Sequence, residues 1–414
     1  MFVLFEARGF HPGFSLRLDE RGRAHEPRFT INLKRSTQNL QLSTRTPADY
    51  PICSPQATKS HNAGHRVPAR GHSMSLRAEL LRLSLKAVKI AKAARKRRDV
   101  PTANIRRRLA LIEPIVPRPP VGTKTTTIDV DGINAVETLV HQARTDRCVL
   151  YFHGGGYAFG SERLVRDFTW RLGAATGASV LYFDYRLAPE HPFPAAVEDA
   201  SKVYRWLAGR MNPARIVFVG DSAGGGLVLA TLHKMRDEGF ALPRAAVAIS
   251  PWTDLALTGP SLHSNAKSDP MMDVKRLPAF ARHYLGEADP RHPYASPLYG
   301  DAAGLPPMLI QVGSDEILRD DATRMAAKLR QAGCEVELEE WPRMPHVWHH
   351  YARLIPEGRR AIERIGAFVQ TRMKSAELSH ARHPLEDGVN SSARVILTDQ
   401  VLEKIIRPFK VPAP

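Results

Sequence analysis

The chain has 414 residues and a formal net charge of +17, and 43% of its residues are hydrophobic, which is enough for a sizeable core. The charge is concentrated at one end: residues 1–108 contain 23 Lys and Arg against seven Asp and Glu, whereas residues 109–414 contain 36 against 35. Because residues 109–414 are nearly neutral, the positive charge of the whole chain is not evidence that it binds nucleic acid. No stretch approaches 18 consecutive apolar residues, so we expect no membrane-spanning helix.

The N-terminal quarter divides into two parts. Residues 1–73 are rich in Arg, His, Pro, Ser and Thr without sustained periodicity, and we interpret them as disordered or as a non-native extension before a true start at Met74. Residues 75–98 predict a basic amphipathic helix, in which Leu, Val and Ile alternate with Arg and Lys. Such a helix could also lie on an anionic membrane surface. Nucleic acid is a weaker alternative, because no aromatic residues interleave the charges.

The rest of the chain alternates strands with helices. The predicted strands are residues 125–130, 135–139, 148–152, 179–184, 216–219, 245–250, 308–312 and 335–340. The predicted helices are residues 164–176, 195–208, 223–238, 271–285, 317–331 and 357–373. The first two strands are expected to be antiparallel, and the later alternation predicts a mostly parallel, eight-stranded α/β sheet with helices on both faces. Residues 374–414 are mostly polar, and we assign this tail no function.

A glycine run follows the buried strand at 148–152 and reads His153-Gly154-Gly155-Gly156. Glycines at this place leave bare backbone N–H groups that can approach a substrate carbonyl oxygen, as an oxyanion hole requires. We expect Gly155 and Gly156 to provide two of these donors. Gly154 and His153 are expected to support the loop, the histidine by shaping it and not by carrying a proton.

The segment Gly220-Asp221-Ser222-Ala223-Gly224 lies between a predicted strand and a predicted helix. It matches the G-x-S-x-G nucleophile elbow of serine hydrolases, in which a sharp turn exposes the serine at the carboxyl edge of the sheet. Gly220 and Gly224 let the start of the helix pass close to the strand. Ser222 is therefore the expected nucleophile, and the N–H of Ala223 is the expected third oxyanion donor.

An acid and a base should follow the serine along the chain. Asp315 lies just past a predicted strand, where its carboxylate can orient an imidazole, although it can also be the N-cap of the next helix. His346 lies on the loop after the last predicted strand, from which it can reach both Asp315 and the serine. His349 and His350 follow closely and are weaker rivals for the role of base.

These motifs together resemble the hormone-sensitive-lipase-like family of α/β-hydrolases, in its bacterial esterase branch. The resemblance covers roughly residues 109–373 and rests on six segments: residues 153–156, 185–196, 220–225, 250–254, 296–298 and 315–318. It implies an α/β-hydrolase domain with a helical cap, to which residues 74–108 and an insertion at about 255–300 contribute. It also implies that Asp221 is structural. From their position, we expect the cap to line an apolar pocket with Met271, Met272, Phe280 and Tyr284.

The residues and the resemblance predict a carboxylic-ester hydrolase acting on short to medium acyl chains through an acyl-enzyme intermediate. A lactone hydrolase is an alternative, because opening a cyclic ester uses the same chemistry. A small-molecule-binding receptor on a hydrolase fold is an alternative of another class, but such receptors have lost the catalytic histidine. A peptidase is less favoured, because nothing in the sequence suggests a peptide-gating domain.

The expected partner is a small-molecule ester, without nucleic acid and without a cofactor. The glycine motifs lack the spacing of phosphate-binding and dinucleotide-binding loops, and no Cys/His set has the spacing of a zinc site, so we expect no metal. Cys53, Cys148 and Cys334 are far apart and predict reduced thiols, which favours a cytoplasmic location. The resemblance implies a monomer or a homodimer.

Overall fold

The structure is a computed structural model that describes residues 74–94 and 102–382. The interpretations of residues 1–73 and 383–414, and the last part of the helix predicted at 75–98, lie outside these ranges. Within them, no helix combines the length and the apolar character that a membrane span needs.

A single eight-stranded sheet forms the centre of the described region, in the order β1-β2-β4-β3-β5-β6-β7-β8. Its strands are β1 (Lys124–Val130), β2 (Ile133–Leu139), β3 (Arg144–Phe152), β4 (Ala178–Phe183), β5 (Ile216–Asp221), β6 (Ala245–Ile249), β7 (Met308–Gly313) and β8 (Val336–Trp341). The pairs β1–β2 and β2–β4 are antiparallel, and all later neighbours are parallel. This confirms the predicted mostly parallel α/β sheet.

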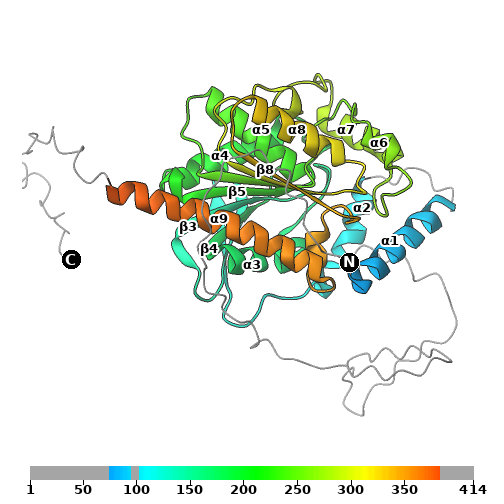
Figure 1. The fold of residues 1–414 in the computed structure, drawn as a ribbon, viewed down its shortest axis with the longest axis horizontal. Helices are drawn as coiled ribbons and strands as arrows, with labels where there is room; N and C mark the ends of the chain where they lie inside the picture. The colour runs from blue at the N-terminus through cyan, green and yellow to red at the C-terminus, as the bar shows by residue number, and fades with distance from the viewer. Residues whose placement is uncertain (1–73, 95–101, 383–414) are drawn as a thin grey trace, which may run out of the picture. The chain divides into compact units, whose positions relative to one another are not determined.

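Helices cover both faces of the sheet (Figure 1). They are α1 (Leu76–Ala94), α2 (Thr102–Ala110), α3 (Glu162–Thr176), α4 (Ala195–Ala208), α5 (Ala223–Asp237), α6 (Ser261–Ser264), α7 (Leu277–Leu285), α8 (Arg319–Gln331) and α9 (Pro356–Arg382). Side chains of α4, α5 and α8 pack into one buried cluster, and side chains of α3 and α9 pack into the other. The sheet is therefore the middle of three layers, as a parallel sheet buried on both faces requires.

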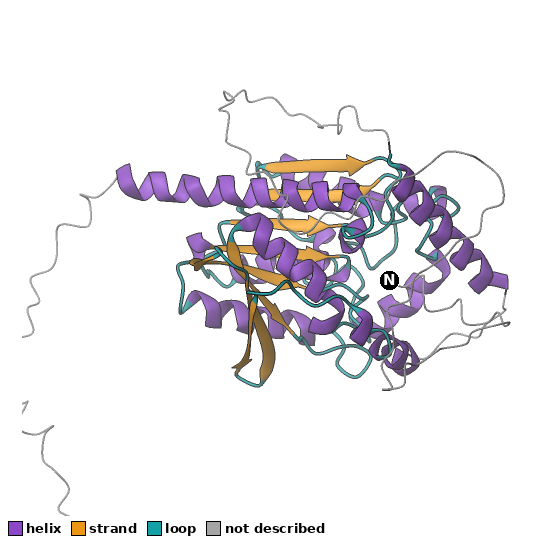
Figure 2. Ribbon diagram, turned by 90° about the horizontal axis from the view of Figure 1, so that it is seen from below, coloured by secondary structure: helices purple, strands orange, loops and turns teal. Residues whose placement is uncertain are grey.

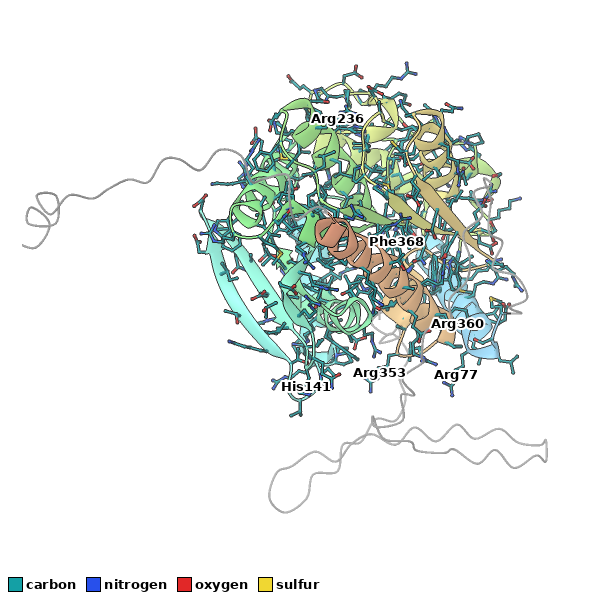
Figure 3. All side chains as sticks on the ribbon, turned by 60° about the vertical axis from the view of Figure 1, so that its left-hand side comes forward. Arg77, His141, Arg236, Arg353, Arg360 and Phe368 are labelled. Carbon is teal, nitrogen blue, oxygen red and sulfur yellow. The ribbon has the colours of Figure 1, made fainter. Side chains whose placement is uncertain are left out.

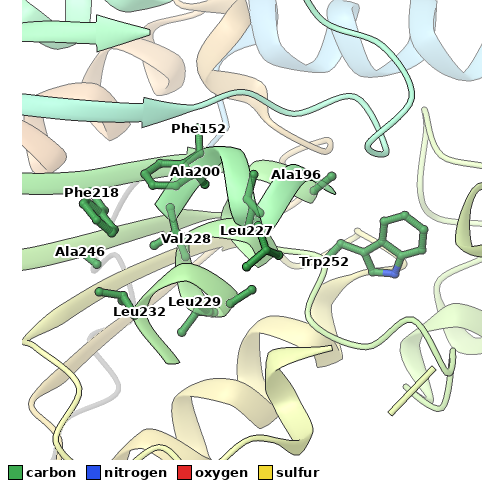
Figure 4. Packing of buried hydrophobic residues seen from close by; sticks show 14 of the residues in the cluster. Phe152, Ala196, Ala200, Phe218, Leu227, Val228, Leu229, Leu232, Ala246 and Trp252 are labelled. Carbon is green, nitrogen blue, oxygen red and sulfur yellow. The ribbon is translucent and has the colours of Figure 1, made fainter. Parts of the chain in front are cut away.

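Alternate side chains of strand β3 pack on opposite faces of the sheet. Cys148, Leu150 and Phe152 join the cluster on the α5 side, whereas Val149 and Tyr151 join the cluster on the α3 side. This alternation follows from the two-residue period of a strand. Figure 4 shows Phe152 among the side chains that α5 contributes to the first cluster. The packing holds the carboxyl end of β3, and the loop that follows it, against the start of α5.

Several elements differ from the predicted ranges. Helix α2 was not predicted, because its nine residues are strongly polar on average and include three consecutive arginines. The helix expected at 271–285 is shorter: Asp273 caps a 3₁₀ turn at Val274–Arg276, and α7 then begins at Leu277 with a proline in its first turn. Asp315 is not an N-cap, since α8 begins at Arg319 after Leu318.

Candidate active site

The parallel strands run toward one edge of the sheet, and Figure 2 shows their arrows pointing to the side where α1 and α2 lie. At this edge Ser222 occupies the turn between β5 and α5 with φ 55° and ψ −122°. This conformation is strained for a residue with a side chain, so neighbouring contacts must hold it. The Ser222 N–H donates to the carbonyl of Ile249 at 2.8 Å, and the Trp252 N–H donates to the carbonyl of Ser222 at 2.9 Å.

The glycines beside the serine have no room for a side chain. A Cβ atom on Gly224 would lie 2.1 Å from the carbonyl oxygen of Phe152, and one on Gly220 would lie 2.4 Å from the carbonyl oxygen of Gly224. Both distances are shorter than any contact a carbon atom tolerates. The close approach of helix and strand that the motif predicts is therefore present.

His346 connects the serine to a buried carboxylate. Its Nε2 lies 2.8 Å from Ser222 Oγ, and its Nδ1 lies 2.8 Å from Glu316 Oε2. The three groups come from the loops after β5, β8 and β7, which meet at the carboxyl edge of the sheet. His346 and Ser222 are buried, and Glu316 is fully buried. The arrangement has the hydrogen-bond pattern of a nucleophile, a base and an orienting acid.

The prediction that Asp315 is the acid beside His346 is wrong in this geometry. The Asp315 carboxylate turns toward Arg82 of α1, with Nη1 3.4 Å from Oδ2, and it remains partly exposed. Glu316, the next residue, points inward instead. Two adjacent acids on a turn face different directions, and the motif alone does not reveal which of them meets the histidine.

The other oxygen of Glu316 is held by the protein. The Gly313 N–H donates to Oε1 at 2.6 Å, and the Ser250 hydroxyl donates to the same oxygen at 2.8 Å. The Val347 N–H in turn donates to the Ser250 hydroxyl oxygen at 3.2 Å. These bonds fix the carboxylate on β7 and connect it to the loop of His346, so that the acid and the base keep their relative positions.

The environment of His346 favours the imidazolium. Burial by itself would lower its pKa, but the hydrogen bond and the negative charge of Glu316 outweigh burial, so the pKa lies above its ordinary value. The charges of Asp269 and Asp221 act in the same direction. An imidazole with a raised pKa accepts a proton from a nearby hydroxyl more readily.

The glycine run after β3 begins close to the start of α5, since a Cβ atom on Gly224 would lie 2.5 Å from the carbonyl oxygen of His153. Gly155 has φ 116°, and a Cβ atom there would lie 1.8 Å from the carbonyl oxygen of Phe159. Among the described residues, neither the Gly155 N–H nor the Gly156 N–H has an acceptor. Ala223 begins α5, and the N–H groups of a first helical turn have no partner within the helix. These are the three donors that the sequence predicts for an oxyanion hole.

Asp221 joins the serine's strand to the glycine loop. Its Oδ1 accepts hydrogen bonds from the Tyr151 hydroxyl at 2.5 Å and from the Gly154 N–H at 3.0 Å, and its Oδ2 lies 3.6 Å from His350 Nε2. Burial raises the pKa of Asp221, but the nearby His350 and the hydrogen bond from Tyr151 outweigh burial and lower that pKa overall. Asp221 is thus a charged, buried anchor for the loop.

The remaining histidines of the motifs do not contact Ser222. His153 is buried and stacks on Tyr185 with ring centroids 4.1 Å apart, while its Nδ1 lies 2.7 Å from the carbonyl oxygen of Gly154. His349 bonds to Gln311 at 2.7 Å, and burial lowers its pKa to about 3. His350 faces Asp221. Of the histidines that the sequence proposed as a base, His346 is the one beside the serine.

The predicted pocket lining is only partly supported. The Phe280 ring lies 3.2 Å from the Cβ position of Gly156, so it forms a wall beside the glycine loop. Tyr284 is instead buried against Tyr157, with ring centroids 3.6 Å apart. Met271 Sδ accepts a hydrogen bond of 3.7 Å from the Tyr351 hydroxyl. The sequence missed Asp269, a buried carboxylate that accepts hydrogen bonds from the Met271, Met272 and Ile317 N–H groups.

Comparisons with known proteins identify the family of the chain. Residues 149–350 match the model of a family described by the α/β-hydrolase fold. The chain is similar to an acetyl-hydrolase of Streptomyces hygroscopicus, with 52% identity over 234 residues that make up 56% of this chain and 78% of that relative.

Two solved structures are similar along almost their whole length. An esterase from the bacterial hormone-sensitive lipase family is 41% identical, with a TM-score of 0.67 over 73% of this chain and 100% of that one. The structure of EstE5 soaked with p-nitrophenyl butyrate is 38% identical, with a TM-score of 0.68 over 72% of this chain and 99% of that one.

Proposed function

The chain belongs to the hormone-sensitive-lipase-like family of α/β-hydrolases and is a carboxylic-ester hydrolase, and we propose that it works through Ser222, His346 and Glu316. The observation that carries this proposal is the pair of hydrogen bonds, each 2.8 Å long, that His346 makes with Ser222 and Glu316. Glu316 takes the role that the sequence analysis gave to Asp315.

In the first half of the reaction, Ser222 Oγ attacks the ester carbonyl carbon while His346 Nε2 takes its proton. Glu316 holds the Nδ1–H tautomer of His346 and stabilises the imidazolium as it forms. The negative charge that develops on the carbonyl oxygen is bound by the N–H groups of Gly155, Gly156 and Ala223. Each such donor is worth about 3 kcal/mol of transition-state stabilisation.

The second half of the reaction reuses the same groups. His346 gives its proton to the departing alcohol, which leaves an acyl group on Ser222. A water molecule then attacks the acyl carbon while His346 takes a proton from it. Collapse of the second tetrahedral intermediate returns the proton to Ser222 and releases the carboxylic acid, so the enzyme ends as it began.

We propose short to medium acyl chains as substrates. The 52% identical relative is an acetyl-hydrolase, and the similar EstE5 was soaked with a butyrate ester. The Phe280 ring against Gly156 adds a bulky wall close to the proposed oxyanion hole. Lactones share the reacting group and stay within the proposal as cyclic esters. A receptor role is disfavoured, because the histidine that such receptors have lost lies beside Ser222 here.

The proposal is tested by hydrolysis of p-nitrophenyl esters from acetate to laurate by the wild type and by Ser222→Ala. We expect turnover of the short esters and a loss of roughly 10⁴-fold or more in kcat for the variant. An active Ser222→Ala variant would contradict the assignment of the nucleophile. Activity only on long-chain esters would leave the nucleophile in place and contradict the proposed acyl size.

A further inference from the structure

The inner side of helix α1 combines two buried apolar residues, Ala78 and Leu85, with polar residues that bond to the rest of the protein. The Ser75 N–H and hydroxyl donate to Glu357 at 2.8 and 3.0 Å, which ties the start of α1 to the start of α9. Further along, Lys89 Nζ donates to the carbonyl oxygens of Ala266 and Asp269 at 3.0 and 2.8 Å. Together with the Arg82–Asp315 contact, these bonds hold one polar side of the helix on the loops around the active site.

The opposite side of α1 is apolar and faces solvent. Leu76, Leu80, Leu83 and Ile90 are 84%, 64%, 51% and 61% exposed. These residues, with the exposed Ala87 and Ala91, fall on one side of the helix at 100° per residue, and we call this side the outer face of α1. A helix of a globular protein normally buries its apolar side, so the outer face needs a partner of another kind.

The charges beside the outer face are positive. Arg77 and Lys86 of α1, and the exposed Arg353 on the loop before α9, make no ion pair with any described residue. The neighbouring acid of α1, Glu79, forms ion pairs with Arg82 and Arg343, at 3.5 and 3.1 Å. Figure 3 shows Arg77 and Arg353 on the same side of the molecule, close to Arg360. The outer face is therefore an apolar stripe among unneutralised cations.

We propose that the outer face of α1 docks this enzyme on an anionic lipid surface. An apolar stripe with flanking Arg and Lys is the pattern of helices that lie in a membrane interface, where the side chains enter the acyl region and the cations meet lipid phosphates. A second copy of the chain would offer the same cations again, and their mutual repulsion disfavours it as the partner. Docking of this kind presents the side of the enzyme that carries Asp269 and Asp315 to the lipid surface.

The proposal is tested by sedimenting the full chain with two kinds of vesicle, phosphatidylcholine alone and phosphatidylcholine mixed with phosphatidylglycerol. We expect binding to the mixed vesicles that weakens as salt is added. The triple variant Leu80→Glu, Leu83→Glu, Ile90→Glu is expected to bind about tenfold or more weakly, because apolar burial is lost. Replacing Arg77, Lys86 and Arg353 by Gln should cost about fivefold per cation.

The matched control is Val121→Glu, which places the same charge at an exposed valine outside the outer face. Its vesicle binding should equal that of the wild type. All variants should hydrolyse a water-soluble ester normally, since none of the substituted side chains contacts the proposed triad. This readout separates vesicle binding from the proposed catalytic roles.

Four results would overturn the proposal. The first is no binding of the wild type to the mixed vesicles, and the second is equal binding to vesicles without phosphatidylglycerol. The third is vesicle binding that survives the triple variant. The fourth is a dimer in solution that the triple variant dissociates, which would make the outer face an interface between two copies.

Discussion

The two halves of the proposed site place their groups by different means. The loops after β3 and β5 use backbone: glycines at 155, 156 and 224 permit close approach, and N–H groups are the proposed donors. The loops after β7 and β8 use side chains: Glu316 and His346 meet through hydrogen bonds that Gly313 and Ser250 support. Where the backbone places a group, the sequence shows it clearly, because only glycine fits the turn. Where side chains place a group, several residue types and positions are compatible with the same sequence pattern.

The strongest test of this difference is to substitute the two neighbouring acids, Asp315 and Glu316, separately. We expect Glu316→Gln to lower kcat by about 10⁴-fold, because an amide donates to His346 Nδ1 and selects the wrong tautomer. Asp315→Asn should change kcat by less than about threefold, since Asp315 faces the partly exposed Arg82. Both changes in kcat are measured by steady-state kinetics on p-nitrophenyl acetate. The reverse ranking would restore Asp315 as the acid.

The backbone half can be tested by adding one methyl group. Gly224→Ala places a carbon 2.1 Å from the Phe152 carbonyl oxygen, so β3 and α5 must separate. We expect a loss of about 3 kcal/mol in the free energy of unfolding, measured by urea denaturation. Gly239→Ala is the control for altered chain entropy: it has φ 69° but no atom near its Cβ position, so it is expected to lose less. Equal losses would argue against the close approach as the cause.

At Asp221 the two kinds of placement meet, because a side chain holds the backbone of the glycine loop. Asp221→Ala leaves the Tyr151 hydroxyl and the Gly154 N–H without their shared acceptor. We expect kcat to fall roughly tenfold to a hundredfold, while KM changes less, because misplaced oxyanion donors act mainly on the transition state. Asp221→Asn should recover part of kcat, since its amide oxygen can still accept from Gly154. No recovery would show that the charge itself is needed.

The smallest expected effect is on pH dependence. The pKa of His346 is raised by Glu316, so the protonated, inactive imidazole persists to higher pH than for an ordinary histidine. The acidic limb of kcat/KM should therefore have a midpoint above 6.5, the usual histidine value. In Glu316→Gln, the residual activity should show that limb at lower pH, because the opposing effect of burial then dominates. An unchanged midpoint would mean that Glu316 does not control this pKa.

Much of the fold followed from patterns of short range. Apolar runs within 148–152, 216–219 and 245–250 predicted buried parallel strands, and the structure confirms them as parts of β3, β5 and β6, except that β6 ends at Ile249, one residue before the predicted end. Helix α2 was missed because it is short and its arginines make it strongly polar. Its Arg106 bonds instead to Ala158, Ala188 and Glu190, residues far away in the sequence.

The sequence by itself predicted the proposed nucleophile, the proposed base and the glycine loop, because the steric demands of a tight turn and of bare N–H donors leave few residue types possible. Tertiary structure alone decided which of Asp315 and Glu316 faces His346. That choice depends on Arg82 of α1 and on Ser250 after β6, which reach the two acids from segments far away in the chain. It likewise decided that Leu76, Leu80 and Leu83 of α1 face outward, because the groups that bond to its other side lie on α9 and on the loop before α7, which only the folded chain brings together.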